Sequence, residues 1–200
     1  MYPFMSNSLA LLKKNLSDSI QAKQLLLEDE LIQAEFVNAA EMVLEKYLGG
    51  GRLYIMGNGG SAADAQHLAA EFVSKLAADR EPLPAEALTV DTSILTAIGN
   101  DYGYEELFAR QIRGKVNKND CVLAITTSGD SPNILRGLET CLERGIETLL
   151  FTGKGGGKAK DLADFCIIAP GNHAGTIQEL HIVLAHTLCG YIENKILGTP

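Results

Sequence analysis

The chain has 200 residues, of which 46% are hydrophobic and 21% are charged, and its formal net charge at pH 7 is -8. This length suits one domain, and the apolar residues suffice for a full core, so neither a disulfide nor a metal ion is needed merely to fold. The acidic balance argues against a nucleic-acid partner, which requires a basic face. It does not exclude a phosphorylated ligand, because backbone N–H groups can bind phosphate inside an acidic protein.

Cysteine usage and hydropathy indicate the compartment. The four cysteines form no C-x-x-C pair and each lies in an apolar run: Cys121, Cys141, Cys166 and Cys189. We interpret them as small buried thiols, which fits a reducing compartment. Residues 1–16 lack the basic start and long apolar segment of a signal peptide, and no run reaches the ~18 apolar residues of a membrane span. We therefore expect a cytoplasmic protein with no membrane contact.

Two helical patterns open the chain. Apolar residues recur at helical spacing over residues 6–28 and again over 30–48, and the second pattern stops at a helix-ending run of three glycines, 49–51. We expect one helix to cover a sheet and the other to serve a partner subunit. In this reading, residues 1–50 are the helical N-terminal segment of a single domain that spans 1–200.

From Arg52 onward, short β-rich runs alternate with helical patterns. The predicted strands are 52–56, 85–90, 120–126, 147–152 and 164–169. The predicted helices are 61–78, 92–98, 104–115, 131–144 and 174–196. This alternation implies right-handed crossovers, so the predicted fold class is α/β, a five-stranded parallel sheet with helices on both faces. Ligands of such sheets bind beyond the carboxyl ends of the strands, which directs attention to the loops there.

The loop after the first strand reads Gly57-Asn58-Gly59-Gly60-Ser61 and leads into a helix. Glycines let the backbone approach an anion closely, and the helix N-terminus offers N–H groups and a partial positive charge. We expect Ser61 to be the N-cap. A tight turn that binds nothing is the alternative. The loop is not a dinucleotide fingerprint, because G-x-G-x-x-G requires a glycine where Ala62 stands.

The loop after the third strand is rich in hydroxyl groups, on Thr126, Thr127, Ser128 and Ser131, and Pro132 follows at a first helical turn. Capping alone needs one hydroxyl, so four indicate phosphate binding at the helix N-terminus. A further glycine-rich segment, 153–158, resembles a P-loop only superficially. Its spacing is one residue short and it lacks the magnesium-binding Ser or Thr, so we interpret it as a flexible turn.

Titratable groups lie on two of the predicted helices. His67 and Glu71 are four residues apart, so they share a helix face and can bind a divalent metal or act as base and orienting group. A solvated surface pair is the alternative. In the last helix, spacing alone does not choose between His181 and His186 as the partner of Gln178.

The pair Asn100-Asp101 follows the helix predicted at 92–98. Its residue types suit either a simple turn or a contact with sugar hydroxyls. The sequence pattern leaves both readings open.

With these residues in hand, the sequence resembles the phosphoheptose isomerases of the sugar-isomerase (SIS) fold over nearly its whole length. The most specific segments are GNGGSAADAQHLAAEF, LTAIGNDYGYEELFARQ, ITTSGDSPNI and IQELHIVLAH. The resemblance implies interconversion of sedoheptulose 7-phosphate and D-glycero-D-manno-heptose 7-phosphate. This is the first step toward the heptose of lipopolysaccharide core or related glycans.

The resemblance also implies site residues. The substrate-binding set is Asn58, Gly59, Gly60, Ser61, Glu71, Asn100, Asp101, Thr126, Thr127, Ser128, Ser131 and Gln178. The implied zinc ligands, for one ion per subunit, are His67, Glu71, Gln178 and His186. Glu71 is the expected base and His186 the expected acid of an enediol mechanism, which leaves His181 as a structural residue. The resemblance further implies a homotetramer.

Three departures from the family pattern are visible. Thr126 stands where serine is common, Lys75 where arginine is common, and Gly175 where some members carry an acid. Any role of that acid is not carried over. Three other functions remain as alternatives: a tetrameric adaptor for the bacterial replication initiator, a sugar-phosphate-sensing regulatory domain, and an isomerase of another phosphosugar. The adaptors tend to lose the carboxylate and final histidine that Glu71 and His186 provide here.

Overall fold

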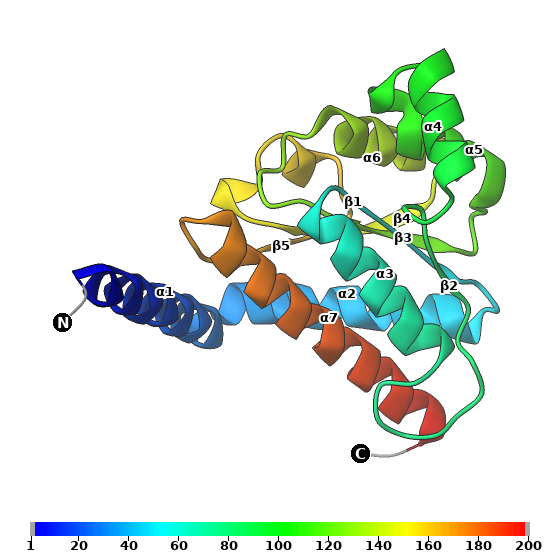
Figure 1. Ribbon diagram of the computed structural model, residues 1–200. Coiled ribbons are helices and arrows are strands. Elements are labelled where there is room, and N and C mark those ends of the chain that lie inside the picture. The colour runs from blue at the N-terminus through cyan, green and yellow to red at the C-terminus, as the bar shows by residue number, and fades with distance from the viewer. Residues whose placement is uncertain (1–2, 199–200) are drawn as a thin grey trace.

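The alternation of strands and helices produces one parallel sheet (Figure 1). The computed structural model describes residues 3–198, and in them the sheet has five strands in the order β2-β1-β3-β4-β5. The strands are β1 (Leu53–Gly57), β2 (Ala85–Ala87), β3 (Cys121–Ile125), β4 (Glu147–Thr152) and β5 (Phe165–Ile168). The α-helices are α1 (Pro3–Glu28), α2 (Glu30–Leu48), α3 (Gly60–Val73), α4 (Thr92–Asp101), α5 (Leu107–Lys115), α6 (Pro132–Arg144) and α7 (Ala174–Leu197).

The two central strands are buried on both faces, as parallel strands rich in aliphatic residues must be. Leu53 pairs with Cys121 and Gly57 with Ile125, so the carboxyl ends of β1 and β3 finish side by side. The loops that follow them, 57–61 and 126–131, therefore emerge at the same edge of the sheet. This register brings together the two loops in which the sequence predicts phosphate binding.

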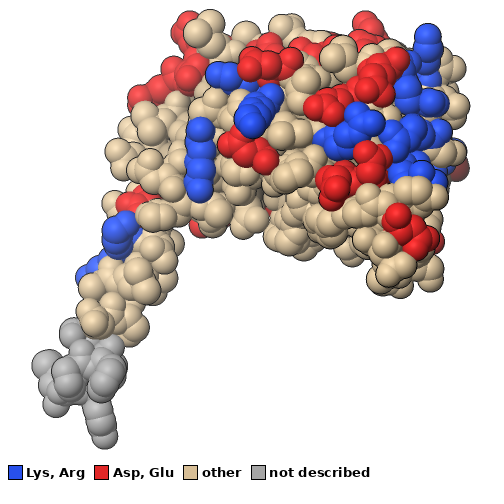
Figure 2. Space-filling model, turned by 90° about the horizontal axis from the view of Figure 1, so that it is seen from above, with Lys and Arg blue, Asp and Glu red and all other residues tan. Residues whose placement is uncertain are grey.

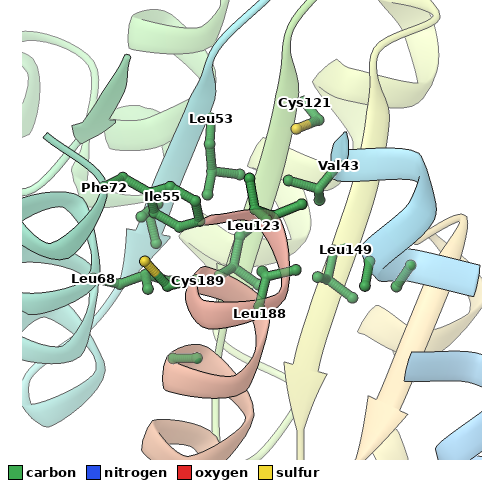
Figure 3. Close-up of a cluster of buried hydrophobic side chains, with 14 of the residues drawn as sticks. Val43, Leu53, Ile55, Leu68, Phe72, Cys121, Leu123, Leu149, Leu188 and Cys189 are labelled. Carbon is green, nitrogen blue, oxygen red and sulfur yellow. The ribbon is translucent and has the colours of Figure 1, made fainter. Parts of the chain in front are cut away.

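Helices cover both faces of the sheet, which confirms the predicted fold class. On one face α2, α3 and α7 enclose a core in which Ile55 and Leu123 of the sheet lie among Phe72 of α3 and Leu188 of α7 (Figure 3). On the other face α4, α5 and α6 enclose a second core that includes Met56. Because neighbouring residues of a strand point to opposite faces, β1 contributes alternately to both cores.

Some element boundaries differ from the predictions. The strand predicted at 85–90 is shorter, and the helix predicted at 104–115 begins as the 3-10 turn η1 (Tyr104–Glu106) before α5. The helix predicted at 61–78 ends at Val73. The backbone N–H groups of residues 76–78 instead donate to the carboxylate of Glu193, so this carboxylate replaces the carbonyl acceptors that a longer helix would have provided.

The two leading helices have different surroundings. Helix α2 packs into the first core, whereas α1 projects from the body as an arm (Figures 1 and 2). Only the later part of α1 packs against α7, where Ala22 contacts the small cluster of Ile177 and Leu180. Leu12 and Leu16, nearer the free end of the arm, are more than half exposed.

On the side that Figure 2 presents, basic and acidic side chains are interspersed, so this face has no large patch of one charge. Within residues 3–198, no helix combines the length and apolar character that a membrane crossing requires.

Three of the cysteines are buried and Cys166 is partly buried, and all four are free thiols. Burial raises the pKa of Cys121 to about 12. The interpretation of the cysteines as inert core residues is therefore confirmed for three of them and largely fits the fourth.

Candidate functional site

The glycine loop makes a tight passage from β1 into α3. A Cβ on Gly57 would lie 2.7 Å from the carbonyl carbon of Ser61, so only glycine fits there. Gly59 has φ 56°, a left-handed value, and is the N-cap of α3. The prediction of Ser61 as N-cap is therefore wrong. The left-handed turn at Gly59 starts the helix at Gly60, and Ser61 is buried inside the first turn.

Asn58 ties the glycine loop to the hydroxyl loop. Nδ2 of Asn58 donates to Oδ1 of Asn133 at 2.8 Å, and Nδ2 of Asn133 donates to Oδ1 of Asn58 at 2.8 Å. The hydroxyl of Tyr104 donates to the same Oδ1 of Asn58 at 3.1 Å. The sequence analysis missed both partners. The available signal for Asn133 was its place directly after Pro132, in the first turn of a helix that faces the sheet edge.

The hydroxyl loop presents its side chains unequally. Thr126 is buried and its Oγ1 accepts from the backbone N–H of Gly129 at 3.4 Å, so in this conformation it braces the loop. Oγ of Ser128 accepts from the backbone N–H of Asp130 at 3.2 Å. Ser131 is the N-cap of α6 but makes no side-chain capping bond. Its hydroxyl and the half-buried Thr127 side chain remain beside the N-terminus of α6, where an anion is favoured.

The segment 153–158 does more than turn the chain. Backbone N–H of Ala159 donates to the carbonyl of Gly129 at 2.9 Å, and that of Lys158 donates to Oδ1 of Asp130 at 3.1 Å. Gly129 has φ 72°, and a Cβ there would lie 2.5 Å from the carbonyl carbon of Gly156. The glycine-rich segment therefore supports the hydroxyl loop from behind through close backbone packing.

Helices α3 and α7 lie side by side and run in the same direction (Figure 1). At their N-terminal ends the carboxamide of Gln178 covers Gly60, where a Cβ would come within 3.0 Å of Cδ. About two turns further on, the ring of His186 meets that of His67, with centroids 5.1 Å apart and an interplanar angle of 75°. The helix pair thus brings residues more than one hundred positions apart onto one seam.

Three side chains of types that can ligate a metal ion converge on this seam. Nε2 of His67 lies 3.1 Å from Oε1 of Glu71 and 3.4 Å from Nε2 of His186, and one ligand atom from each lies within 4.8 Å of the others. The predicted sharing of one face by His67 and Glu71 is confirmed. Among the described interactions, Gln178 has none with these three residues. The structure thus shows a His/Glu/His group that could hold a metal ion.

The two histidines of α7 have distinct surroundings. His181 is fully buried, its Nε2 donates to the carbonyl of Thr152 at 3.0 Å, and burial holds its pKa below the usual range. His186 is half-buried and faces His67. This arrangement agrees with the expected structural role of His181.

Asp64 is a candidate that the sequence analysis did not single out. It lies one turn before His67 on α3, and its Oδ2 is buried without a hydrogen-bond partner. Burial raises the pKa of its carboxyl, although nearby His67 opposes the shift.

Asn100 and Asp101, for which the sequence pattern allows a simple turn, are the last two residues of α4. Both are exposed, and Nδ2 of Asn100 donates to Oδ1 of Asp101 at 2.7 Å.

A parallel sheet with two loops that lead into helices at one edge, and a His/Glu/His group on the seam of α3 and α7, defines the class of protein. The family model described as the SIS domain matches residues 17–153, which include the first four strands and both loops. The fold is therefore that of a SIS domain.

Close relatives identify the family within that class. The phosphoheptose isomerase of Aneurinibacillus thermoaerophilus is 47% identical over 92% of this chain and 93% of its own length. Phosphoheptose isomerase 2 of Campylobacter jejuni is 45% identical over 97% and 96%. The solved phosphoheptose isomerase of Neisseria gonorrhoeae superposes with a TM-score of 0.86 at 37% identity, over 93% of this chain and 98% of that one. The chain belongs to the phosphoheptose isomerase family.

Proposed function

We propose that this chain is an aldose–ketose isomerase that interconverts sedoheptulose 7-phosphate and D-glycero-D-manno-heptose 7-phosphate, the first step toward the heptose of lipopolysaccharide core or related glycans. The single observation that carries the site assignment is the convergence of His67, Glu71 and His186 on the seam between α3 and α7. Full-length similarity to phosphoheptose isomerases supports the substrate.

The phosphosugar is held by the two loops at the carboxyl edge of the sheet. The N-termini of α3 and α6 offer backbone N–H groups and partial positive charge, and the half-buried hydroxyls of Thr127, Ser128 and Ser131 add donors. The substrate-binding set is that given by the resemblance: Asn58, Gly59, Gly60, Ser61, Glu71, Asn100, Asp101, Thr126, Thr127, Ser128, Ser131 and Gln178. Within it, Asn58 and Thr126 fix the loops, because the polar atoms of Asn58 are bonded to Asn133 of α6 and those of Thr126 to the backbone of Gly129.

Glu71 and His186 are the catalytic residues in this proposal. Glu71 removes the C1 proton of the ketose, next to the carbonyl carbon C2, and returns a proton to C2 of the enediol. His186 donates a proton to the carbonyl oxygen at C2 and later accepts the proton of the C1 hydroxyl. One carboxylate oxygen of Glu71 faces His67, and the carboxylate has a second oxygen for proton transfer. Geometry supports this division, because both side chains reach the same seam between α3 and α7.

A zinc ion, one per subunit, fits the donor set. Two imidazole nitrogens and a carboxylate oxygen are ligands that catalytic zinc accepts, and such sites can expand to five ligands, which would admit a substrate oxygen. Neighbouring ligand atoms of a tetrahedral zinc site are about 3.4 Å apart, and the separations of 3.4 and 3.1 Å between the ligand atoms here support the fit. Gln178 is the proposed fourth ligand. Bound zinc supplies a Lewis acid that polarises the sugar carbonyl.

We also propose that four copies assemble in the cytoplasm. Exposed leucines along α1 support assembly, since a monomer rarely leaves such a row in water. An apolar groove of about 610 Å³ between α1, α2 and α7, lined in part by Phe36, Val37 and Val183, adds to the surface that a second copy would cover. The unpaired cysteines favour a reducing compartment.

Deuterium incorporation tests the reaction. The protein, supplied with Zn²⁺, is incubated with sedoheptulose 7-phosphate in heavy water, and the products are analysed by mass spectrometry and NMR. An aldose product with deuterium at C2 in at least part of it supports the enediol route, and the same experiment with Glu71→Gln should show neither product nor exchange. Binding of sedoheptulose 7-phosphate without turnover or exchange would contradict the proposal and favour a non-catalytic adaptor.

A further inference from the structure

A buried ion pair joins the segment that follows α3 to α7, beyond the proposed active site. The side chains of Arg80 and Glu193 are 1% and 3% exposed, and Nε of Arg80 donates to Oε2 of Glu193 at 2.9 Å. The rest of the guanidinium group binds main-chain carbonyls. Its Nη2 donates to the carbonyl of Glu71 at 2.9 Å, and its Nη1 donates to those of Phe72 at 2.8 Å and Glu81 at 3.1 Å.

Glu193 also binds the chain that follows α3. Its two carboxylate oxygens accept from the backbone N–H groups of Leu76 at 3.3 Å, Ala77 at 3.2 Å and Ala78 at 2.8 Å. These bonds stop α3 at Val73 and fold the following segment back against α7. Arg80 thus satisfies two of the last carbonyls of α3, and its ion pair with Glu193 anchors them to α7.

The geometry links this ion pair to the reacting groups. Glu193 follows His186 by seven residues, nearly two helical turns, so both side chains lie on the same face of α7. On α3 the contact is more direct, since Arg80 holds the backbone carbonyl of Glu71 itself. The backbone that carries Glu71 and the face that carries His186 are therefore connected through one planar guanidinium group. A lysine could not make these bonds simultaneously, because it lacks the planar fork.

We infer that Arg80 and Glu193 are positioning residues that set the separation of Glu71 from His186. This inference rests on the proposed function. A buried ion pair costs desolvation free energy and is often replaceable by apolar residues when only stability is required. Its bonds here are directed at the backbone of a reacting residue, and loss of residues that orient metal ligands typically lowers metal affinity or activity about 10–100-fold.

The experiment compares Arg80→Lys and Glu193→Gln with a matched control, Asp120→Asn. Asp120 is also a buried carboxylate that accepts backbone N–H bonds, from Arg52 at 3.0 Å and Asn117 at 2.8 Å. It directly precedes β3, so it lies at the amino ends of the strands, away from the loops at their carboxyl ends. For each full-length protein we would measure Tm, the affinity for Zn²⁺ alone by competition with a chromophoric chelator, and kcat and KM for sedoheptulose 7-phosphate.

The expected result is a weakening of zinc affinity and a fall in kcat of about tenfold or more in both ion-pair variants, with KM changed less than about threefold. Asp120→Asn should lower Tm but leave zinc affinity and kcat within about twofold. Ion-pair variants that only lower Tm, like the control, would overturn the inference and leave the proposed function intact. If Arg80→Lys does not fold, the isosteric Glu193→Gln decides alone. Wild-type protein that neither binds zinc nor turns over substrate would overturn both proposals.

Discussion

Replacing Gly129 with alanine tests the close packing behind the hydroxyl loop. Gly129 has φ 72°, and a Cβ there would lie 2.5 Å from the carbonyl carbon of Gly156 and 2.8 Å from the backbone nitrogen of Gly157. Gly155 provides a matched control, because its φ is 79° and a Cβ there would meet nothing within 4 Å. The two alanine variants share the cost of a left-handed backbone and differ in the collision.

The magnitudes follow from these two environments. A left-handed L-residue costs about 1–2 kcal/mol, which applies to both variants. Overpacking against backbone adds about 1–3 kcal/mol only in Gly129→Ala. With about 2–4 °C of Tm per kcal/mol for a chain of this size, we expect losses of about 5 °C for Gly155→Ala and about 10 °C for Gly129→Ala. The reduced entropy of the unfolded chain affects both variants alike and cancels in the comparison.

The assay is thermal unfolding followed by circular dichroism, with KM for sedoheptulose 7-phosphate measured well below Tm. Because the collision displaces the hydroxyl loop from segment 153–158, KM should rise in Gly129→Ala and stay near the wild-type value in Gly155→Ala. Equal Tm values for the two variants, together with equal KM values, would refute the argument that segment 153–158 supports the loop.

Three further predictions concern α7 and α1. His181→Asn should lower the free energy of unfolding by about 1–3 kcal/mol with kcat unchanged, because it removes a buried hydrogen bond. His186→Asn should lower kcat at least about 100-fold with little change in Tm. The opposite pattern would exchange the roles of the two histidines. Burial raises the pKa of Glu193, but the N–H groups of residues 76–78 and Arg80 outweigh it, so the folded-state pKa lies below the usual value. The stabilisation is present above the unfolded pKa of about 4.3 and is lost as pH falls through the folded pKa. The Tm difference between wild type and Glu193→Gln should thus narrow from pH 6 to pH 3, and a constant difference would contradict this sign. Leu16→Glu in the exposed arm should reduce the oligomer size seen by light scattering, and an unchanged mass would exclude this leucine from the interface.

Much of the fold is predictable from local sequence pattern. Aliphatic runs bounded by glycine, such as 53–57, indicate strands without reference to the rest of the chain, and their alternation with helical periodicity implies a parallel sheet. The same holds for local parts of the site. His67 and Glu71 share a helix face because of their spacing, and the glycine and hydroxyl loops are recognisable from composition.

The remaining features depend on contacts between distant segments, for which a single sequence gives little signal. Asn58 and Asn133 are 75 residues apart, and neither has a local pattern that indicates the other. Arg80 and Glu193 have residue types that are usually solvated, so their burial is not predictable from periodicity. For the same reason the pattern predicts a helix that extends to residue 78, whereas α3 ends at Val73. The acceptor that terminates it, Glu193, comes from another helix.

The position of α7 in the chain has a consequence for biosynthesis. All five strands precede it, so a growing polypeptide can complete its sheet at Ile168 while the His/Glu/His group still lacks His186. Until α7 docks, the apolar side of the sheet that Leu188 covers stays open to water, and such surface is where nascent chains associate wrongly. Docking of this last helix closes the core and brings His186 to His67 and Glu71 in the same event, so a chain whose core is still open also lacks the complete His/Glu/His group.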